Sequence, residues 1–210
     1  PADRALFTVP TLAEEIALID GLNRSRGYTA GLYIELKGDH FHRAEGKDLA
    51  AAVLQVLEAA GWHRADSPVF LQSFEPATLR RLAEEFCSPL PRIQLIAEND
   101  WGEVPGVDYD ALVTDEGLAA VARYATGIGP WIGRLYRGRD AEGEAQVTDL
   151  VSRAHAAGLL VHPYTFRSDA LPAGIDSFDA LLGLFVDRLG VDGLFTDFPD
   201  RARAYLQGNP

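Results

Sequence analysis

The 210-residue sequence contains no methionine, and Cys87 is its single cysteine. One cysteine excludes an internal disulfide and leaves the redox compartment open. No window approaches the length of a membrane-spanning helix, and no segment has the pattern of a signal peptide. Because the chain begins Pro-Ala-Asp, we expect either a removed initiator methionine or the remainder of a longer or processed product.

Basic residues are also scarce, with 19 Lys and Arg against 31 Asp and Glu, giving a formal net charge of -12. Without a basic stripe, this charge argues against a nucleic-acid or anionic-membrane partner, and we expect no membrane insertion. An anionic substrate would need a local pocket of positive charge, for which Lys37 is a candidate. The length suits one domain over residues 1–210, and no boundary in composition asks for two.

Apolar strand-like runs alternate with helical stripes about six times, which predicts a parallel sheet covered by helices. Six units are fewer than the eight that a closed β/α barrel needs. No glycine-rich phosphate fingerprint follows any strand, which disfavours a dinucleotide-binding sheet. The predicted strands are 31–37, 69–74, 92–97, 127–130, 159–162 and 193–197. The predicted helices lie between Thr11 and Gly27 and at 49–57, 76–86, 115–125, 145–156, 178–186 and 200–206.

The first predicted strand ends with two charged side chains that point the same way, Glu35 and Lys37, while Leu36 points opposite. An exposed Glu–Lys pair at a strand end is common and contributes little to stability. The alternative is a site, because the carboxyl ends of parallel strands carry the active site in barrels and the ligand crevice in open sheets.

Other candidates follow later strands. Gln72 and His162 close apolar strands, and His162 faces either a site or the core. Phe74 and Tyr164 are loop aromatics that could line a pocket. A glycoside hydrolase that pairs Glu35 with Glu98 is an alternative, since such enzymes use two carboxylates. The pair His40 and His42, on an expected extended loop, is interpreted as solvated.

Taken together in order, several blocks resemble the glycerophosphodiester phosphodiesterases, particularly the larger periplasmic bacterial type. Each block is a moderate signal, but as an ordered set spanning nearly the whole chain they are specific. The blocks are Gly31-Leu32-Tyr33-Ile34-Glu35-Leu36-Lys37, Phe41-His42-Arg43, Glu45-Gly46-Lys47-Asp48, Leu71-Gln72-Ser73-Phe74, Gln94-Leu95-Ile96-Ala97, Gly127-Ile128-Gly129-Pro130, 162–169 (HPYTFRSD) and 191–200 (VDGLFTDFPD).

The resemblance implies a TIM-type (β/α) barrel that hydrolyses glycerophosphodiesters to glycerol 3-phosphate and an alcohol with a divalent metal, Ca²⁺ or Mg²⁺. It implies that Glu35 is a metal ligand and that Lys37 faces the phosphate. Phe74 and Tyr164 would line the glycerol or alcohol side, and we expect Gln72 and His162 to contact substrate. It also implies a periplasmic or secreted protein, although the missing signal peptide leaves a cytoplasmic location open.

The chain departs from that family at its start. The family's His-Arg-Gly strand end, its Glu-x-Asp pair of metal ligands and its His-Asp acid/base have no counterpart here. We therefore expect the carboxyl-terminal two-thirds of such an enzyme, lacking the first two β/α units and inactive by itself. It would be a fragment, a piece completed by a missing N-terminal segment, or a non-catalytic short homologue that binds a ligand or partner. An open barrel exposes strand edges, so a stable short form would need a dimer partner or a rearrangement.

Overall fold

The computed structural model describes residues 8–208, and a parallel sheet of five strands lies at its centre. Strands that follow one another along the chain are neighbours in the sheet, in the order β1-β2-β3-β4-β7, and all four pairings are parallel. Parallel neighbours require crossover connections, which the helices provide. The strands are β1 (Leu32–Glu35), β2 (Val69–Ser73), β3 (Arg92–Ile96), β4 (Gly127–Pro130) and β7 (Leu160–Val161).

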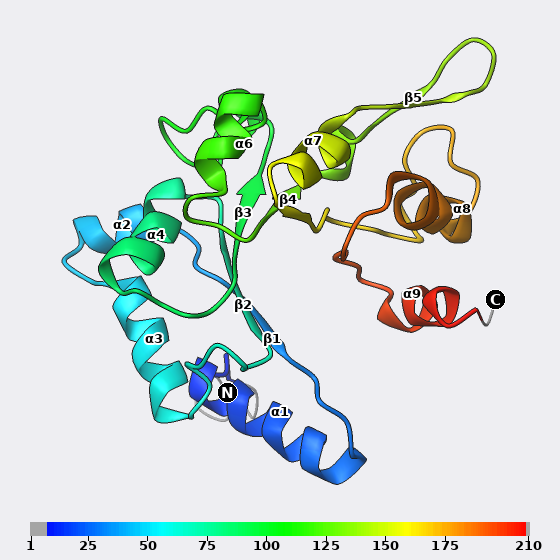
Figure 1. The fold of residues 1–210 in the computed structure, drawn as a ribbon. Helices are drawn as coiled ribbons and strands as arrows, with labels where there is room; N and C mark the ends of the chain where they lie inside the picture. Colours follow the sequence, from blue (N-terminus) through cyan, green and yellow to red (C-terminus); the bar gives the residue numbers. More distant parts are fainter. Residues whose placement is uncertain (1–7, 209–210) are drawn as a thin grey trace, which may run out of the picture.

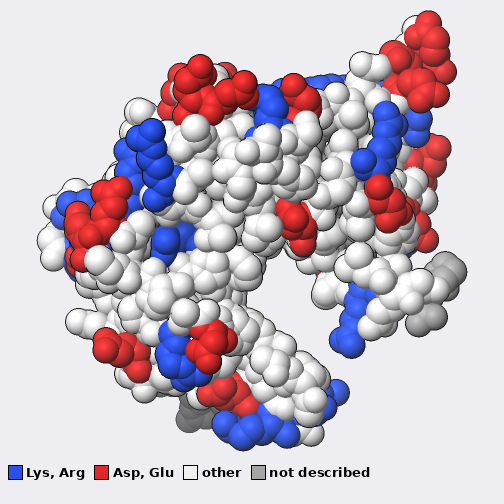
Figure 2. All heavy atoms as spheres, in the orientation of Figure 1, with Lys and Arg blue, Asp and Glu red and all other residues white. Residues whose placement is uncertain are grey.

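The helices lie on one side of the sheet, and the chain follows an arc from α1 through α6 and α7 to α8 and α9 (Figure 1). The space-filling view is hollowed on the inner side of this arc, and the hollow opens between α1 and α9 (Figure 2). The helices are α1 (Leu12–Arg26), α2 (Asp39–Ala44), α3 (Leu49–Ala59), α4 (Pro76–Arg80), α5 (Tyr109–Leu112), α6 (Asp115–Val121), α7 (Leu150–Ala156), α8 (Phe178–Leu182) and α9 (Pro199–Leu206). Two π-helical turns, η2 (Arg81–Glu85) and η5 (Gly183–Leu189), extend α4 and α8.

Local sequence sets the helix starts. Thr11 and Glu14 form a capping box at α1, in which the Glu14 carboxylate accepts from the Thr11 amide at 2.7 Å. The Asp48 carboxylate accepts from the Ala51 amide at 3.0 Å and caps α3. Pro76 occupies the first turn of α4, where its missing N–H is no loss. These starts confirm the sequence prediction for the three helices.

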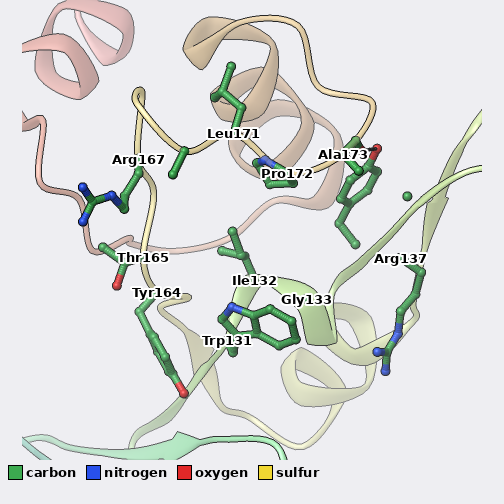
Figure 3. A pocket seen from close by; sticks show the side chains of 13 residues that line it. Trp131, Ile132, Gly133, Arg137, Tyr164, Thr165, Arg167, Leu171, Pro172 and Ala173 are labelled. Atoms are coloured by element: carbon green, nitrogen blue, oxygen red, sulfur yellow. Dashed lines mark hydrogen bonds between the residues drawn. The ribbon is translucent and has the colours of Figure 1, made fainter.

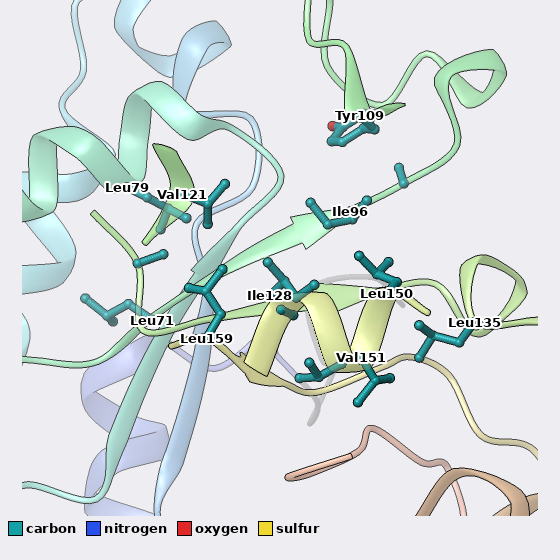
Figure 4. Close-up of a cluster of buried hydrophobic side chains, with 14 of the residues drawn as sticks. Leu71, Leu79, Ile96, Tyr109, Val121, Ile128, Leu135, Leu150, Val151 and Leu159 are labelled. Carbon is teal, nitrogen blue, oxygen red and sulfur yellow. The ribbon is translucent and has the colours of Figure 1, made fainter. Parts of the chain in front are cut away.

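The core lies between the sheet and the helices that cover it (Figure 4). Leu71 and Ile128 from the strands meet Leu79 and Val121 from α4 and α6, and all four side chains are fully buried. Burying a leucine or isoleucine side chain of this kind stabilises the fold by about 1.5–3 kcal/mol. This packing fixes the strands and therefore the directions in which their carboxyl ends point.

The structure corrects three predicted elements. Residues 193–197 form no strand; they run beside the chain after β7 and make one isolated bridge, between Phe166 and Thr196. The predicted helix at 145–156 begins only at Leu150, because β6 (Ala145–Val147) pairs antiparallel with β5 (Tyr136–Arg139). Residues 39–44 form helix α2, where an extended loop was expected.

Each miss has a physical reason. Residues 193–197 do bond to the chain after β7, since the Phe195 amide donates to the Pro163 carbonyl at 3.0 Å and the Phe166 amide donates to the Phe195 carbonyl at 2.8 Å, but these bonds are too few to make a continuous strand. The hairpin is not evident in the sequence because its strands are only four and three residues long, too short for their alternation to be recognised. Helix α2 begins after Gly38, whose φ of 69° turns the chain sharply at the end of β1.

No helix within residues 8–208 is long and apolar enough to cross a membrane.

Candidate active site

A cleft with a volume of about 320 Å³ lies at the carboxyl ends of β1 and β2. Five of the six predicted site residues line it, although they come from three separate parts of the sequence. These residues are Glu35, Lys37, Gln72, Phe74 and Tyr164. Parallel strands bring their carboxyl ends to one edge of a sheet, which explains why residues so far apart in sequence share one cleft.

The alternation of β1 continues two residues past the strand and places Glu35 and Lys37 on the cleft side. Leu36 is buried on the helix side, and its amide donates to the Gln72 carbonyl at 2.8 Å, so the ladder extends to this residue. The Lys37 ammonium Nζ lies 3.9 Å from Glu35 Oε1. The surface interpretation of this pair is therefore too simple: Lys37 is 70% exposed and Glu35 only 32%, and both face a concavity.

A second carboxylate, which the sequence analysis missed, meets Lys37 in the cleft. Glu103 Oε1 lies 3.4 Å from Lys37 Nζ, and the Glu103 side chain is 26% exposed. It comes from the loop after β3, which the Asn99 side chain fastens by accepting from the Tyr109 amide at 2.7 Å. The only indication of Glu103 in the sequence is its position in a long loop after a strand, because such loops gather at the carboxyl-end face of a parallel sheet.

The cleft acts on the ionisation of Glu35. Partial burial raises the pKa of the Glu35 carboxyl above its ordinary value; the Lys37 charge lowers it, and Glu103 adds a further rise. A carboxylate that is costly to ionise benefits from an added cation, whether an ammonium or a metal ion. The electrostatics of the cleft therefore favour a positively charged guest beside Glu35.

Gln72 is the direct neighbour of Glu35 on the adjacent strand, since the two are Cα partners in the register of β1 and β2. Its side-chain oxygen is buried and accepts no hydrogen bond from the described residues. A buried amide oxygen without a donor costs free energy unless a ligand or cation satisfies it. Glu35 and Gln72 both line the same cleft.

Aromatic rings form the remaining walls of the cleft. The Lys37 ammonium lies 6.0 Å from the centre of the Phe74 ring, which packs edge-on against Tyr164 with ring centres 5.9 Å apart. The Tyr164 hydroxyl donates to the Ile96 carbonyl at 3.0 Å, which fixes this ring. Trp101 and Phe195 add further aromatic surface.

His162, the sixth predicted site residue, lies beneath the cleft and does not line it. Its Nδ1 is 2.8 Å from the Tyr33 hydroxyl, and the ring packs on Gly193, where a Cβ atom would come within 2.9 Å. Burial lowers the pKa of His162, with Asp192 partly opposing the shift. The neutral ring therefore ties the inner face of β1 to the chain after β7, and a contact with substrate stays a prediction.

The described residues supply only part of a metal site. Within residues 8–208, no three His, Cys, Asp or Glu side chains lie close enough together to hold a metal ion. Glu98 does not line the cleft; its Oε2 lies 3.0 Å from the Arg134 guanidinium. The carboxylate pair of the glycoside-hydrolase alternative is thus not assembled in this cleft.

Comparison with known proteins gives a consistent result. The model of the Glycerophosphoryl diester phosphodiesterase family matches residues 1–201. A glycerophosphodiester phosphodiesterase of Haemophilus influenzae is 33% identical over 99% of this chain and 61% of its own length. One from Treponema pallidum is 29% identical over 97% of this chain and 61% of its own length. The chain thus spans about three-fifths of these curated relatives.

Two solved structures share the fold. One from Silicibacter pomeroyi, provisionally assigned as a glycerophosphoryl diester phosphodiesterase, has a TM-score of 0.64 and 26% identity over 96% of this chain and 58% of its own. A phosphodiesterase from Oleispira antarctica, solved with its product sn-glycerol-3-phosphate, has a TM-score of 0.62 and 20% identity over 95% of this chain and 62% of its own. The chain therefore has a TIM-like α/β fold, in which the described strands form a five-stranded sheet without a pairing that closes it.

Proposed function

Because the chain belongs to the glycerophosphoryl diester phosphodiesterase family, we propose that it carries one wall of a metal-assisted site that hydrolyses glycerophosphodiesters. In this reaction water adds to phosphorus, the bond from phosphorus to the alcohol oxygen breaks, and the alcohol leaves with a proton, giving glycerol 3-phosphate. The observation that supports the proposal is the meeting of Glu35, Lys37 and Gln72 in one cleft at the strand ends.

The residues of the cleft fit a hard divalent cation such as Ca²⁺ or Mg²⁺. Such ions prefer carboxylate and amide oxygens, which would come from Glu35 and from Gln72, whose side-chain oxygen has no donor within residues 8–208. A bound cation would also lower the cost of ionising Glu35, whose pKa is raised by burial. When bound, it would supply positive charge to phosphoryl oxygens.

Lys37 is the group that we propose to contact the phosphate. Its ammonium stands between two carboxylates, 3.9 Å from Glu35 and 3.4 Å from Glu103, and the side chain is free to turn because it is 70% exposed. A phosphate oxygen in the cleft would replace these partners. The charge on the ammonium then offsets the charge that develops on the phosphoryl oxygens during hydrolysis.

We propose that further strands complete the site. Within residues 8–208, β1 is an edge strand, and the hollow of the molecule opens beside it. The curated relatives are longer than this chain. Strands of the family's barrel that pair with the free edge of β1 would close the ring and bring the remaining metal ligands and the acid/base to the cleft. Alternatively, a dimer partner would cover the free edge of β1.

The test measures binding and turnover of the 210-residue chain. We expect sn-glycerol 3-phosphate to bind in calorimetric titrations, Ca²⁺ or Mg²⁺ to strengthen binding, and Glu35→Gln to remove the metal effect. Glu45→Gln, at an exposed glutamate outside the cleft, is the matched control. We expect no release of glycerol 3-phosphate from glycerophosphocholine by the chain alone. Metal-dependent release that Glu35→Gln abolishes would show that the site is complete without further strands, and binding that ignores Glu35 and Lys37 would reject the site.

A further inference from the structure

A second and larger cavity, of about 670 Å³, lies beside the cleft and belongs to none of the roles above. We call it the groove (Figure 3). One wall consists of the short helix η4 (Ile132–Arg134) and the start of β5, and the other is the loop 164–173. The groove lies on the β4 and β7 side of the sheet, away from the open edge at β1.

Hydrogen bonds fasten the two walls to each other. At the floor, the Ile132 amide donates to the Tyr164 carbonyl at 2.8 Å. At the far end, the Tyr136 hydroxyl donates to the Ala173 carbonyl at 2.8 Å, and Arg139 Nε donates to the Gly174 carbonyl at 2.6 Å. The groove is therefore a preformed cavity, because its walls are linked at the floor and at the far end.

The inner surface of the groove is apolar. Ile132, Leu171 and Pro172 face one another across it, with the Trp131 ring at one side (Figure 3). The charged groups stay at its margin. Arg167 pairs with Asp169 at 2.8 Å and Asp197 at 2.9 Å, and its guanidinium points away from the apolar side chains.

The groove begins where the cleft ends. Tyr164 and Thr165 line both cavities. Trp131 of the groove also packs edge-on against Trp101 of the cleft, with ring centres 5.2 Å apart. A diester whose phosphate lies beside Lys37 can therefore extend a substituent past Tyr164 into the groove.

We propose that the groove takes the hydrocarbon chain of a glycerophosphodiester that carries a single acyl group. The proposal rests on the proposed function, since the cleft would place the phosphodiester. Glycerol and small amino alcohols are polar and would leave apolar walls unfilled, whereas a hydrocarbon chain gains from burial against them.

The experiment titrates the 210-residue chain with monoacyl glycerophosphocholines of six, eight and ten acyl carbons, each below its critical micelle concentration. A buried methylene strengthens binding by up to about fourfold. We expect the affinity to rise at least about tenfold from six to ten carbons, because partial burial gives a fraction of that gain. Leu171→Glu places a carboxylate in the groove and should abolish the rise. Ala173→Trp, which fills the groove and keeps the backbone carbonyl that Tyr136 uses, is the second variant.

Leu18→Glu is the matched control, because Leu18 is a 61% exposed leucine on α1, remote from both cavities. An affinity that does not change with chain length in the wild type would overturn the proposal. So would a rise that persists in folded Leu171→Glu or Ala173→Trp, since the acyl chain would then bind elsewhere. The titration needs no turnover: phosphate binding that does not depend on Lys37, together with an intact chain-length effect, rejects the proposed function and keeps the groove. Phosphate binding that depends on Lys37, without any chain-length effect, rejects only the groove.

Discussion

The cleft takes its charged groups from the carboxyl end of β1 and from the loop after β3. The groove, in contrast, is formed by the connections that follow β4 and β7. In the cleft, Glu35, Glu103 and Lys37 face one another, and the pKa of Glu35 is raised. In the groove, the side chains that face inward are apolar, and Arg167 is paired outside. The cleft is thus electrostatically suited to a charged guest and the groove to an apolar one.

The two cavities also differ in how far described residues support them. Hydrogen bonds link the walls of the groove to each other at its floor and at its far end. The cleft adjoins the edge strand β1, and within residues 8–208 it rests on the Tyr33–His162 hydrogen bond below it. The following variants test three features one at a time: the hydrogen bond that supports the cleft, the charge of the cleft, and the wall that the cleft shares with the groove.

The largest effect is expected from Tyr33→Phe, which removes the hydroxyl beneath the cleft. His162 Nδ1 loses its partner at 2.8 Å and stays buried, which costs about 1–3 kcal/mol of unfolding free energy. Urea unfolding measures the change. Tyr28→Phe, at a tyrosine 50% exposed, should change stability by less than about 0.5 kcal/mol. Equal losses in both variants would show that the Tyr33–His162 bond does not support the cleft.

Lys37→Ala tests the charge of the cleft. Hydrogen bonds to charged groups contribute about 1.5–3 kcal/mol, and the 70% exposure of Lys37 places it at the lower end. We therefore expect sn-glycerol 3-phosphate to bind about tenfold more weakly, as measured by calorimetry. The exposed Lys47, the other lysine of the chain, provides the control Lys47→Ala. The acyl-chain-length effect should be unchanged, and its loss would mean that the cavities are not independent.

Trp131→Ala tests the wall that the cavities share. Trp131 lines the groove and packs against Trp101 in the cleft. Burying about 30–50 Å² of the acyl chain against this ring contributes about 0.7–1.3 kcal/mol, so we expect losses of about three- to tenfold for the ten-carbon ligand and smaller losses for glycerol 3-phosphate. Trp62→Ala changes a tryptophan that lines neither cavity. A loss confined to glycerol 3-phosphate would contradict the placement of this ring.

The same contrast explains what the sequence could predict. Strand alternation determines that Glu35 and Lys37 share a side, and parallel pairing determines that Gln72 joins them, so local patterns are sufficient for that part of the cleft. Glu103 and the groove depend on long connections, whose paths follow from tertiary contacts such as Asn99 with Tyr109 and Tyr136 with Ala173. His162 ends its strand as a site residue would, but its partner Tyr33 lies 129 residues away, and no local pattern indicates that bond.

The smallest effect concerns the ionisation of Glu35. Its folded pKa is raised, chiefly by burial, so the folded state holds this proton at pH values where the unfolded chain has lost it. Stability is therefore lost as pH rises from the unfolded value of about 4.5 through the folded pKa. Glu35→Gln should unfold at higher urea concentration than the wild type at pH 7, with no such gain at pH 4. The lost attraction to Lys37 opposes this only weakly, because that ammonium is 70% exposed at 3.9 Å. The exposed Glu45→Gln should show no difference between the two pH values. If Glu35→Gln destabilises the chain at pH 7, the Lys37 attraction outweighs burial, and the cleft does not need a second cation to hold an ionised Glu35.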